Sequence, residues 1–329
     1  MLISIILPVY NAEKFIERCI QSLLVQSLDD VEVIMIDDCS KDNGFQKAID
    51  LINSNGMQAH FKLLRNTHNL NCAGSRNRGI SEATGEYITF VDSDDYVDEH
   101  YLSELMSTIA EHNSDVIIYD YKEITRTEAI LHEFQPLSTP EDVIVALLLN
   151  KMHNSLCNKV FRRSLMVDNG INMPCNLTHY DDKAICFKLI YNAKVISFIP
   201  KCLYFYDRRN EGSVTRGDQR KHVASAVDVV KIIDDFFVDK PKSAALEEAI
   251  EVNKMHILGF VLLYGTEAEI QKYSKYLGKF RIKSILLVGN VPMHYRLAVL
   301  FKQNHLSFVT TLIRHALSSY QNAVKKNRK

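Results

Sequence analysis

An acidic stretch at residues 90–98, FVDSDDYVD, holds four Asp directly after the apolar run EYITFV. Carboxylates packed this closely repel one another and raise each other's pKa values unless a cation or a hydrogen-bond donor compensates them. Hard divalent cations bind carboxylate oxygens. At least one Asp of the DSDD sequence at 92–95 is therefore a candidate cation ligand.

Polar and aromatic side chains also lie at the ends of two other predicted strands. Pro8, Tyr10 and Asn11 end the first apolar run, LISIILPV, and Asp37 and Asp38 follow the second, VEVIMI. In an open α/β sheet, ligands bind outside the carboxyl ends of the strands, so we expect these side chains to share one crevice with the acidic turn. Each alone is better explained as a cap or a solvated turn than as a binding residue. The three strand ends together favour a nucleotide diphosphate site.

In such a site an aromatic ring like that of Tyr10 can cover a base, and one Asp of the pair at 37–38 can accept a hydrogen bond from a ring N–H or a ribose hydroxyl. A cation at the acidic turn would bridge two phosphates and neutralise the charge that develops on a departing diphosphate. Arg76 and Arg78 could add a charged donor to a phosphate or to the acidic cluster. The alternative for the two Arg is one buried ion pair and one surface charge.

Alternating strands and helices must position these side chains. Continuous apolar runs predict buried parallel strands, and amphipathic stretches between them predict helices, the first with Asn11 as its N-cap. The first ~120 residues therefore indicate a doubly wound, mainly parallel α/β sheet. Strands are predicted at 2–9, 31–36, 60–65, 86–91, 115–121, 194–199 and 202–207, and helices at 44–53, 72–83, 100–112, 140–150 and 181–192, with mostly helical sequence from about 219.

The composition, with 47% hydrophobic and 24% charged residues among 329, is typical of a soluble globular protein. The longest apolar run, ILGFVLLYG at 257–265, is too short to span a bilayer, and the N-terminus lacks the features of an export signal. The seven Cys include no CxxC pair, which argues against a zinc site or a disulfide framework. These features predict a cytoplasmic protein.

The charge is unevenly distributed along the chain. Residues 270–329 contain 12 Lys and Arg and no Asp or Glu, whereas the preceding residues contain 27 Lys and Arg against 40 acids. Basic residues interleaved with apolar ones at helical spacing are typical of a helix on an anionic membrane surface, and equally of a helix packed on its own domain. No nucleic-acid-binding motif accompanies them, so no nucleic acid partner is expected. The apolar positions are Leu297, Leu300, Phe301, Phe308, Leu312, Ile313 and Leu317.

Several motifs occur together in an order that resembles bacterial family 2 glycosyltransferases of the GT-A fold. They are SIILPVYN, VEVIMIDDCSKD, NLNCAGSRNRGISEATGEYITFVDSDD, NSLCNKVFRRSLMVDNGINMP and YDDKAICFKLI. The resemblance covers roughly residues 1–215. It implies transfer of a sugar from a nucleotide-sugar donor, with Mn²⁺ or Mg²⁺ and inversion at the anomeric carbon.

The resemblance also implies roles for individual residues. Pro8, Tyr10 and Asp38 would line the base, Asp92 and Asp94 would hold the ribose and diphosphate, and Asp94 or Asp95 would bind the metal. An inverting transfer needs a base that deprotonates the acceptor hydroxyl. The family places it in a Glu-Asp pair that opens a helix, and the corresponding pair here makes Asp182 the predicted base. Two acids in a first helical turn could instead serve the helix dipole alone.

The chain departs from the family pattern at two positions. The roles of one further stretch and of one histidine are less specific. Asp181 stands where the pair has Glu, so its supporting role is open. Cys39 stands where the family has Gly, which predicts that no positive φ is needed there. In YFYDRRNEGSVTRG, Arg208, Arg209 and Ser213 would meet phosphate oxygens or belong to a solvated loop. His179 would contact acceptor or metal, or serve the fold alone.

These observations predict a catalytic domain at 1–215, with a nucleotide-sugar-binding half at 1–120 and an acceptor half at 121–215, and a basic, mostly helical region at 216–329. The expected partners are a nucleotide-sugar donor, most simply a UDP-sugar, and a saccharide or lipid-linked saccharide acceptor at the inner face of the membrane; a dimer is left open. Two alternatives are a sugar-nucleotide nucleotidyltransferase, disfavoured because PVYNAEKF has no Gly-rich phosphate loop, and a non-catalytic carbohydrate-binding protein, disfavoured because the acids are all present.

Overall fold

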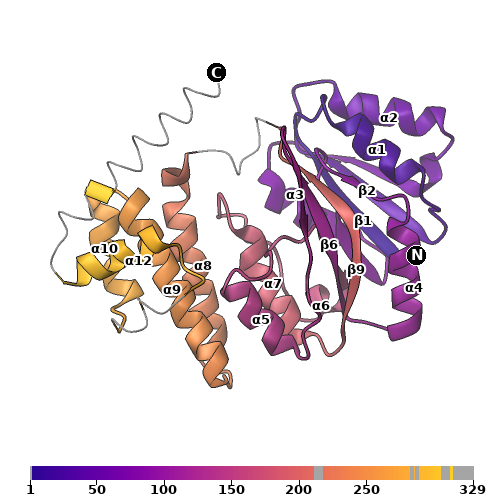
Figure 1. Cartoon of the computed structure of the whole chain (residues 1–329). Coiled ribbons are helices and arrows are strands. Elements are labelled where there is room, and N and C mark those ends of the chain that lie inside the picture. The colour runs from indigo at the N-terminus through magenta and orange to yellow at the C-terminus, as the bar shows by residue number, and fades with distance from the viewer. Residues whose placement is uncertain (1, 211–217, 282–284, 286–288, 305–311, 314–329) are drawn as a thin grey trace. The chain divides into compact units, whose positions relative to one another are not determined.

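The computed structural model describes residues 2–210, 218–281, 285, 289–304 and 312–313 (Figure 1). It divides into two compact units, which are described separately below. The first comprises residues 1–143, 154–176 and 181–216, and the second comprises 144–153, 177–180 and 217–329. The domain boundary expected after residue 215 stays a prediction.

The first unit is built on a nine-stranded mixed sheet, and the described part of the second unit is helical, so the expected α/β class with a helical C-terminal region is confirmed. The strand order is β3-β2-β1-β4-β8-β6-β9-β5, with β7 paired to β6 outside this path. The pairs among β3, β2, β1 and β4 are parallel, as expected, whereas β8 pairs antiparallel with both β4 and β6. The strands are β1 (Ile3–Val9), β2 (Val31–Asp37), β3 (Phe61–Arg65), β4 (Tyr87–Phe90), β5 (Tyr96–Val97), β6 (Val116–Ile124), β7 (Ala129–His132), β8 (Lys159–Arg162) and β9 (Ile196–Asp207).

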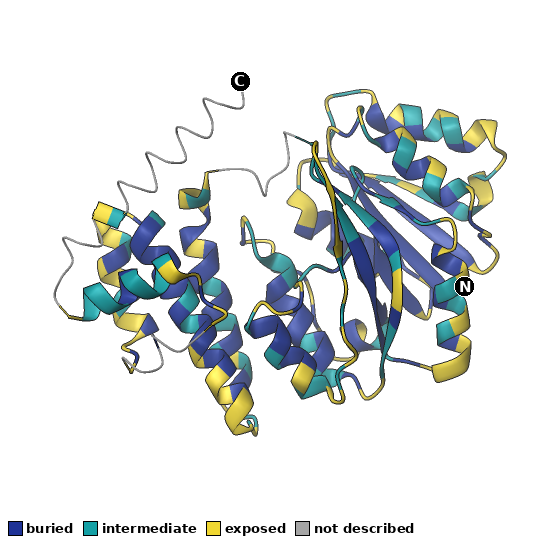
Figure 2. Cartoon of the chain, in the orientation of Figure 1, coloured by how far each residue is buried: buried dark blue, intermediate teal, exposed yellow. Residues whose placement is uncertain are grey.

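Helices cover both faces of the parallel part, which explains why β1 and β2 are buried along their whole length (Figure 2). Alternate residues of a strand point to opposite faces. Ile3, Ile5 and Leu7 pack in the core formed with the first, second and fourth helices. The helices of this unit are α1 (Ile16–Leu24), α2 (Gly44–Ser54), the 3₁₀ turn η1 (Gln58–His60), α3 (Asn71–Glu82), α4 (Tyr101–His112), α6 (Ser164–Val167) and α7 (Asp181–Asn192), and α5 (Pro140–Leu148) begins here and ends in the second unit.

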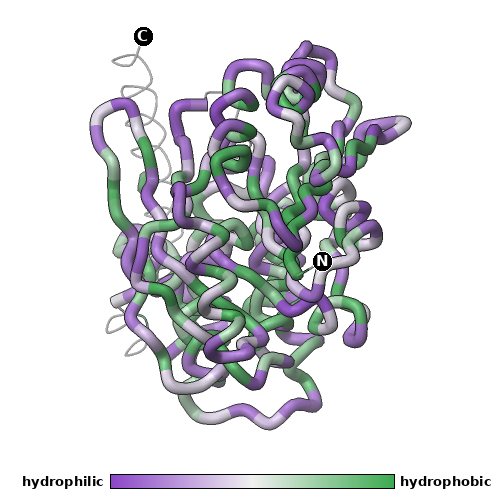
Figure 3. The backbone as a smooth tube through the Cα atoms, turned by 90° about the vertical axis from the view of Figure 1, so that its right-hand side faces the viewer, coloured by the Kyte–Doolittle hydropathy of each residue, from purple (hydrophilic) through white to green (hydrophobic). Residues whose placement is uncertain are grey.

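The other face of β1 is covered by α3 at very short range. A Cβ atom added at Gly79 would lie 2.5 Å from Cγ2 of Ile6 and 3.2 Å from Cδ1 of Ile36. Glycine is therefore required there because the helix backbone lies directly against the sheet. This close packing fixes the position of Arg76, one turn earlier on α3. The apolar strands and the polar connections between them appear as green and purple stretches of the tube in Figure 3.

Three local predictions differ from the structure. The apolar runs at 194–199 and 202–207 form one strand, β9, whose register against β6 shifts near Asp120. The short strands β5, β7 and β8 were not predicted. The helix expected to be capped by Asn11 begins at Ile16 with no side-chain cap, and Asn11 has a φ of 48°. The Asn11 side chain instead accepts a hydrogen bond from the backbone N–H of Lys41 at 2.9 Å.

The second unit is helical. Its helices have well-defined starts: Ser243 caps α9, and Thr266 with Glu269 forms a capping box at α10. Leu300 and Ile313 pack against its core, whereas Leu312 is 62% exposed. The elements are the 3₁₀ turn η3 (Gln219–His222), α8 (Val223–Phe237), α9 (Ala244–Tyr264), α10 (Glu267–Leu277) and α12 (Met293–Gln303).

The basic region predicted to contact a membrane is only partly described. Phe308 and Leu317 of its apolar pattern lie outside the described residues. In the part of the chain that the structure describes, no helix has the length and apolar character needed to cross a bilayer.

Candidate active site

The acidic turn at 92–95 directly follows β4 and is held by side chains from several elements. Asp92 accepts a hydrogen bond from Nη2 of Arg76 at 2.9 Å, and its backbone N–H donates to the Tyr204 hydroxyl at 3.1 Å. The Tyr204 hydroxyl in turn donates to Oδ2 of Asp95 at 2.6 Å, while Oδ1 of Asp95 accepts from the backbone N–H of Asp207 at 2.7 Å. Asp92 and Asp95 are thus anchored to α3 and to β9.

The geometry separates the two predicted metal ligands. Asp95 is 0% exposed and both of its oxygens accept hydrogen bonds, so it is poorly suited to bind an incoming cation. Asp94 is partly exposed, and from the side chains that the structure describes its carboxylate accepts one hydrogen bond, from Asn210 at 2.9 Å. Burial and the charge of Asp92 raise the pKa of Asp94, and the Asn210 bond opposes this. A cation would stabilise the charged form of such a carboxylate, so Asp94 is better suited than Asp95 to bind a metal ion.

Arg76 connects the acidic turn to the acid pair that begins α7. Its Nη1 lies 2.6 Å from Oδ1 of Asp182 and 3.7 Å from Oδ2 of Asp181, in addition to the Asp92 contact. The Arg76 side chain is only 5% exposed. It therefore makes the buried ion pair that was one of its two expected roles, and it brings residues 92 and 182 into one cluster.

The acid pair contains two carboxylates in different surroundings. Asp182 is bound at both oxygens, by Arg76 and by the backbone N–H of Leu156 at 3.1 Å. Asp181 has only the longer Arg76 contact among its side-chain ion pairs in the described residues. Burial and the charge of Asp182 raise the pKa of Asp181 to about 6, although Arg76 opposes the shift. The site thus offers one firmly oriented carboxylate and one whose protonation changes near neutral pH.

A second group of polar side chains lies at the ends of β1 and β2. Oδ1 of Asp38 accepts from Nδ2 of Asn66 and from the backbone N–H of Leu70, both at 2.7 Å. Asp38 is 3% exposed, and no further side-chain bond within the described residues occupies its other oxygen. Asp37 is bound by Arg65 at 2.8 Å and by the Ser40 N–H at 2.9 Å. Asp38 therefore retains one oxygen for a ligand, whereas Asp37 supports the turn.

Three further predicted residues lie at the end of β1, beside these acids. Tyr10 is 49% exposed immediately after β1, which leaves its ring available to a base. Pro8 is buried within β1 opposite Ile36, so its ring is not exposed to a ligand in this structure. Asn11 links the end of β1 to the turn after β2 through Ser40 and Lys41.

Comparisons with known proteins identify the family of the chain. A family model described as glycosyl transferase family 2 matches residues 4–169, half of the chain. The chain belongs to glycosyl transferase family 2. The resemblance drawn from the motifs is therefore confirmed.

The relatives of this glycosyltransferase are themselves named as glycosyltransferases, and two of them are named for poly(ribitol-phosphate). EpsH of Bacillus subtilis, named as a glycosyltransferase, is 29% identical over 67% of this chain and 64% of its own length. The poly(ribitol-phosphate) beta-N-acetylglucosaminyltransferase TarS of Staphylococcus aureus is 32% identical over 64% of this chain, and a poly(ribitol-phosphate) beta-glucosyltransferase of Bacillus spizizenii is 26% identical over 93%. The chain spans only 36% and 49% of the lengths of these last two.

Solved structures share the fold at lower sequence identity. Residues 1–349 of S. aureus TarS in complex with UDP-GlcNAc match with a TM-score of 0.71 and 21% identity, covering 97% of this chain and 92% of that one. A mannosyltransferase from Pyrobaculum calidifontis in complex with GDP-Man and Mn²⁺ matches with a TM-score of 0.54 and 14% identity, covering 95% and 86%.

One prediction made from the family pattern is wrong for this glycosyltransferase. Cys39 has a φ of 66°, in the left-handed region that glycine adopts most easily. The turn after β2 therefore does need the conformation that a Gly at this position provides. The chain places a cysteine in it, and the Cys39 thiol lies 3.7 Å from the carbonyl oxygen of Asn66.

The remaining predicted residues make contacts with other protein groups or lie outside the described residues. Arg208 pairs with Glu123 at 2.7 Å and Arg209 pairs with Asp207 at 2.6 Å, so both are engaged in protein contacts. Ser213 lies outside the described residues. His179 belongs to the second unit, where its ring packs on Tyr180 and His222.

Several residues that hold the site together were not predicted from the sequence. Tyr204, Asp207 and Arg18 all contact the acidic turn, and Asn66 fixes Asp38. For Tyr204 and Asp207 the available signal was the polar end of an otherwise apolar strand, CLYFYD. No local pattern marks Arg18 or Asn66.

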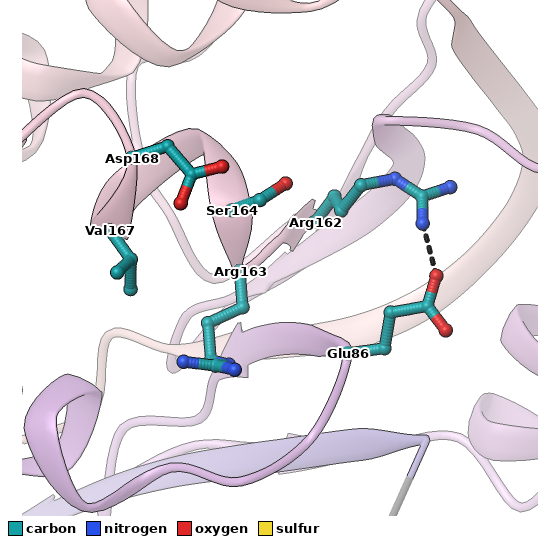
Figure 4. Close-up of a pocket in the computed structure, with 6 residues that line it drawn as sticks. All are labelled: Glu86, Arg162, Arg163, Ser164, Val167 and Asp168. Carbon is teal, nitrogen blue, oxygen red and sulfur yellow. Dashed lines mark hydrogen bonds and ion pairs between the residues drawn. The ribbon is translucent and has the colours of Figure 1, made fainter.

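Two surface hollows of the first unit lie away from this site. Two hollows of about 200 and 350 Å³ lie beside α6 and share Arg163 and Val167 in their linings. Figure 4 shows the smaller one, in which Glu86 and Arg162 form an ion pair. Glu86 precedes β4 whereas the acidic turn follows it, so this hollow lies at the opposite end of that strand.

The carboxylates of the site fit a cation whose remaining ligands come from the phosphates of a bound substrate. No cluster of three or more His, Cys, Asp or Glu in the described ranges is arranged to hold a metal alone. Mg²⁺ and similar ions are commonly bound by one or two carboxylates together with substrate phosphates. Asp94 supplies a carboxylate of this type.

Proposed function

We propose that this protein transfers a sugar from a nucleotide-diphosphate sugar, most simply a UDP-sugar, to a hydroxyl of a saccharide or lipid-linked saccharide, with inversion and with Mn²⁺ or Mg²⁺. The observation that carries the proposal is the Arg76 cluster, which joins the acidic turn to the acid pair of α7. A donor-binding group and a candidate base are thereby held in one place. The family assignment supports glycosyl transfer over nucleotidyl transfer.

The residues would act in the following way. Tyr10 would cover the base, and the open oxygen of Asp38 would accept its ring N–H. Asp92 and Asp94 would hold the ribose and the metal-bound diphosphate, where a divalent cation supplies neutralisation of the developing negative charge. Asp182, oriented by Arg76 and Leu156, would take the proton of the acceptor hydroxyl as that oxygen attacks the anomeric carbon. The bond from that carbon to the diphosphate oxygen would break at the same time, and the nucleoside diphosphate would leave.

The names of two relatives favour a second acceptor class. TarS and the B. spizizenii enzyme are both named for poly(ribitol-phosphate), and the latter aligns with nearly the whole chain. A polyol-phosphate polymer is therefore the alternative acceptor. The inner face of the membrane remains the proposed location for either acceptor, and sedimentation of the intact chain with anionic vesicles at low and high salt tests it.

Metal-dependent donor binding is the decisive test. We expect UDP and UDP-GlcNAc to bind more tightly in Mn²⁺ than in EDTA by calorimetry, and Asp94→Asn to remove this difference and to abolish release of UDP from a donor. Asp50→Asn, at an exposed position on α2, is the matched control. Full activity in excess EDTA would contradict the proposal, and a chain that binds donors but transfers to no acceptor would support the non-catalytic alternative.

A further inference from the structure

One side of α1 and the residues just after it form a polar stripe along the acidic stretch. Arg18, Ser22 and Gln26 follow one another at intervals of four residues. The Arg18 Nη2 donates to the carbonyl oxygen of Asp94 at 2.8 Å, the Ser22 hydroxyl accepts from the N–H of Val97 at 3.2 Å, and the Gln26 amide donates to the carbonyl oxygen of Asp98 at 2.8 Å. The stripe therefore binds the backbone of 94–98 and leaves the carboxylate of Asp94 untouched.

Arg18 differs from the other two because it is charged and because it reaches a second element. Its Nη1 lies 2.6 Å from Oδ2 of Asp207, at the end of β9. Its guanidinium lies over the ring of Tyr96 with 4.3 Å to the centroid, and Tyr96 stacks on Phe205 of β9 at 4.6 Å. A planar fork with two donors and an apolar face suits these three contacts, and a lysine ammonium would not reproduce them.

Asp207 completes a closed loop of contacts around the turn. Its backbone N–H donates to Asp95, and its side chain is 0% exposed and also binds Arg209. Burial would raise the pKa of Asp207, but hydrogen bonds from Arg209 and Arg18 lower it to about 2. The Arg18–Asp207 pair is therefore charged at neutral pH and ties α1, the acidic turn and β9 together.

We propose that Arg18 and Asp207 are positioning residues for the cation and diphosphate site. Arg18 fixes the carbonyl of Asp94 through its charged fork and so sets the direction of the Asp94 carboxylate. Ser22 and Gln26 hold the later part of the stretch, which carries none of the proposed ligands. The inference rests on the proposed function, because it assigns a role in metal-assisted donor binding.

The test compares nucleotide affinity with and without metal. Arg18→Lys keeps the charge and loses the fork. We expect its UDP affinity in Mn²⁺ to fall about tenfold, as for loss of a hydrogen bond from a charged group, while its affinity in EDTA stays within about twofold of wild type. Asp207→Asn should act in the same direction. Arg220→Lys is the matched control, since Arg220 also donates through two nitrogens, both to Asp218 two residues away, but its side chain is 73% exposed.

The outcomes separate this inference from the proposed function. Wild-type protein that shows no Mn²⁺-dependent UDP binding would overturn the proposed function and the inference with it. A normal Mn²⁺ response in both variants, beside a responsive wild type, would overturn the inference alone. An equal loss in Mn²⁺ and in EDTA, or failure of both variants to fold, would make the pair a purely structural ion pair and would overturn it as well.

Discussion

The two acidic regions of the site differ in how their charge is compensated. At the ends of β1 and β2, Asp37 has its own arginine, and Asp38 has an amide and a backbone N–H. At the acidic turn and the start of α7, Asp92, Asp181 and Asp182 share one buried arginine, Arg76. The pKa values of Asp94, Asp95 and Asp181 are raised, first by burial and then by neighbouring carboxylates.

This difference indicates in which region protein groups alone compensate the carboxylates, and in which region a bound cation would be needed. A carboxylate that is hydrogen-bonded by protein groups is ready to recognise a neutral base. Carboxylates in excess of their counter-ions favour either a proton or a metal ion. Substitutions at the nucleobase region, at the ends of β1 and β2, should therefore change nucleotide affinity equally with and without metal. Substitutions at the acidic turn and the start of α7 should change turnover or the effect of metal on nucleotide affinity.

The largest effect is expected from Asp182→Asn. Loss of a general base should lower kcat by about 100-fold or more and leave donor affinity nearly unchanged, because the base acts only as the acceptor attacks. Steady-state kinetics together with calorimetric donor affinity checks this. Asp181→Asn is the matched variant and should retain more activity.

Two results would change the assignment. Collapse of donor affinity in Asp182→Asn would show a binding or structural acid. A larger loss in Asp181→Asn, with disappearance of an activity decline as the pH falls through about 6, would identify Asp181 as the base, since its pKa lies there.

A smaller effect, on affinity alone, is expected from Asp38→Asn. The retained oxygen would keep the bonds from Asn66 and Leu70, so the new NH₂ group would replace the open oxygen and face the base as a donor. We expect UDP affinity to fall about tenfold, equally in Mn²⁺ and in EDTA, and CDP, whose ring nitrogen is an acceptor, to lose less. A loss confined to Mn²⁺ would erase the distinction between the two regions.

The smallest effect concerns stability. The folded-state pKa of Asp181 is raised to about 6, above its ordinary value of 3.8, so the folded protein binds this proton more tightly than the unfolded chain does. Stability from this group is therefore present below about pH 4 and is lost as the pH rises through about 6. Asp181→Asn should raise Tm by about 2–4 °C at pH 7 and not at pH 4, measured against wild type by calorimetry. An equal shift at both pH values would exclude ionisation of the Asp181 carboxyl as the cause.

The sequence predicts those parts of the site that depend on local pattern. Uninterrupted apolar runs identified β1, β2 and β4, and the acids that follow them were visible at once. The Arg76–Asp182 contact was not predicted, although both residues were singled out, because 106 positions separate them. Arg18 and Asn66 could not be recognised, since their roles depend on which backbone atoms the fold brings beside them. The left-handed backbone at Cys39 was missed because the residue type argued against it.

The contacts that Asp92 and Asp95 make with Tyr204 and Asp207 span 109 to 112 positions of the chain. A ribosome adds roughly 5–20 residues per second, so the acidic turn would be synthesised some 5 to 20 seconds before its partners on β9. β9 is also the strand that joins β5 to β6 in the sheet. The turn therefore reaches its observed form only when β9 enters the sheet, and a nascent chain ending near residue 120 carries the acids of the turn without the groups that hold Asp95.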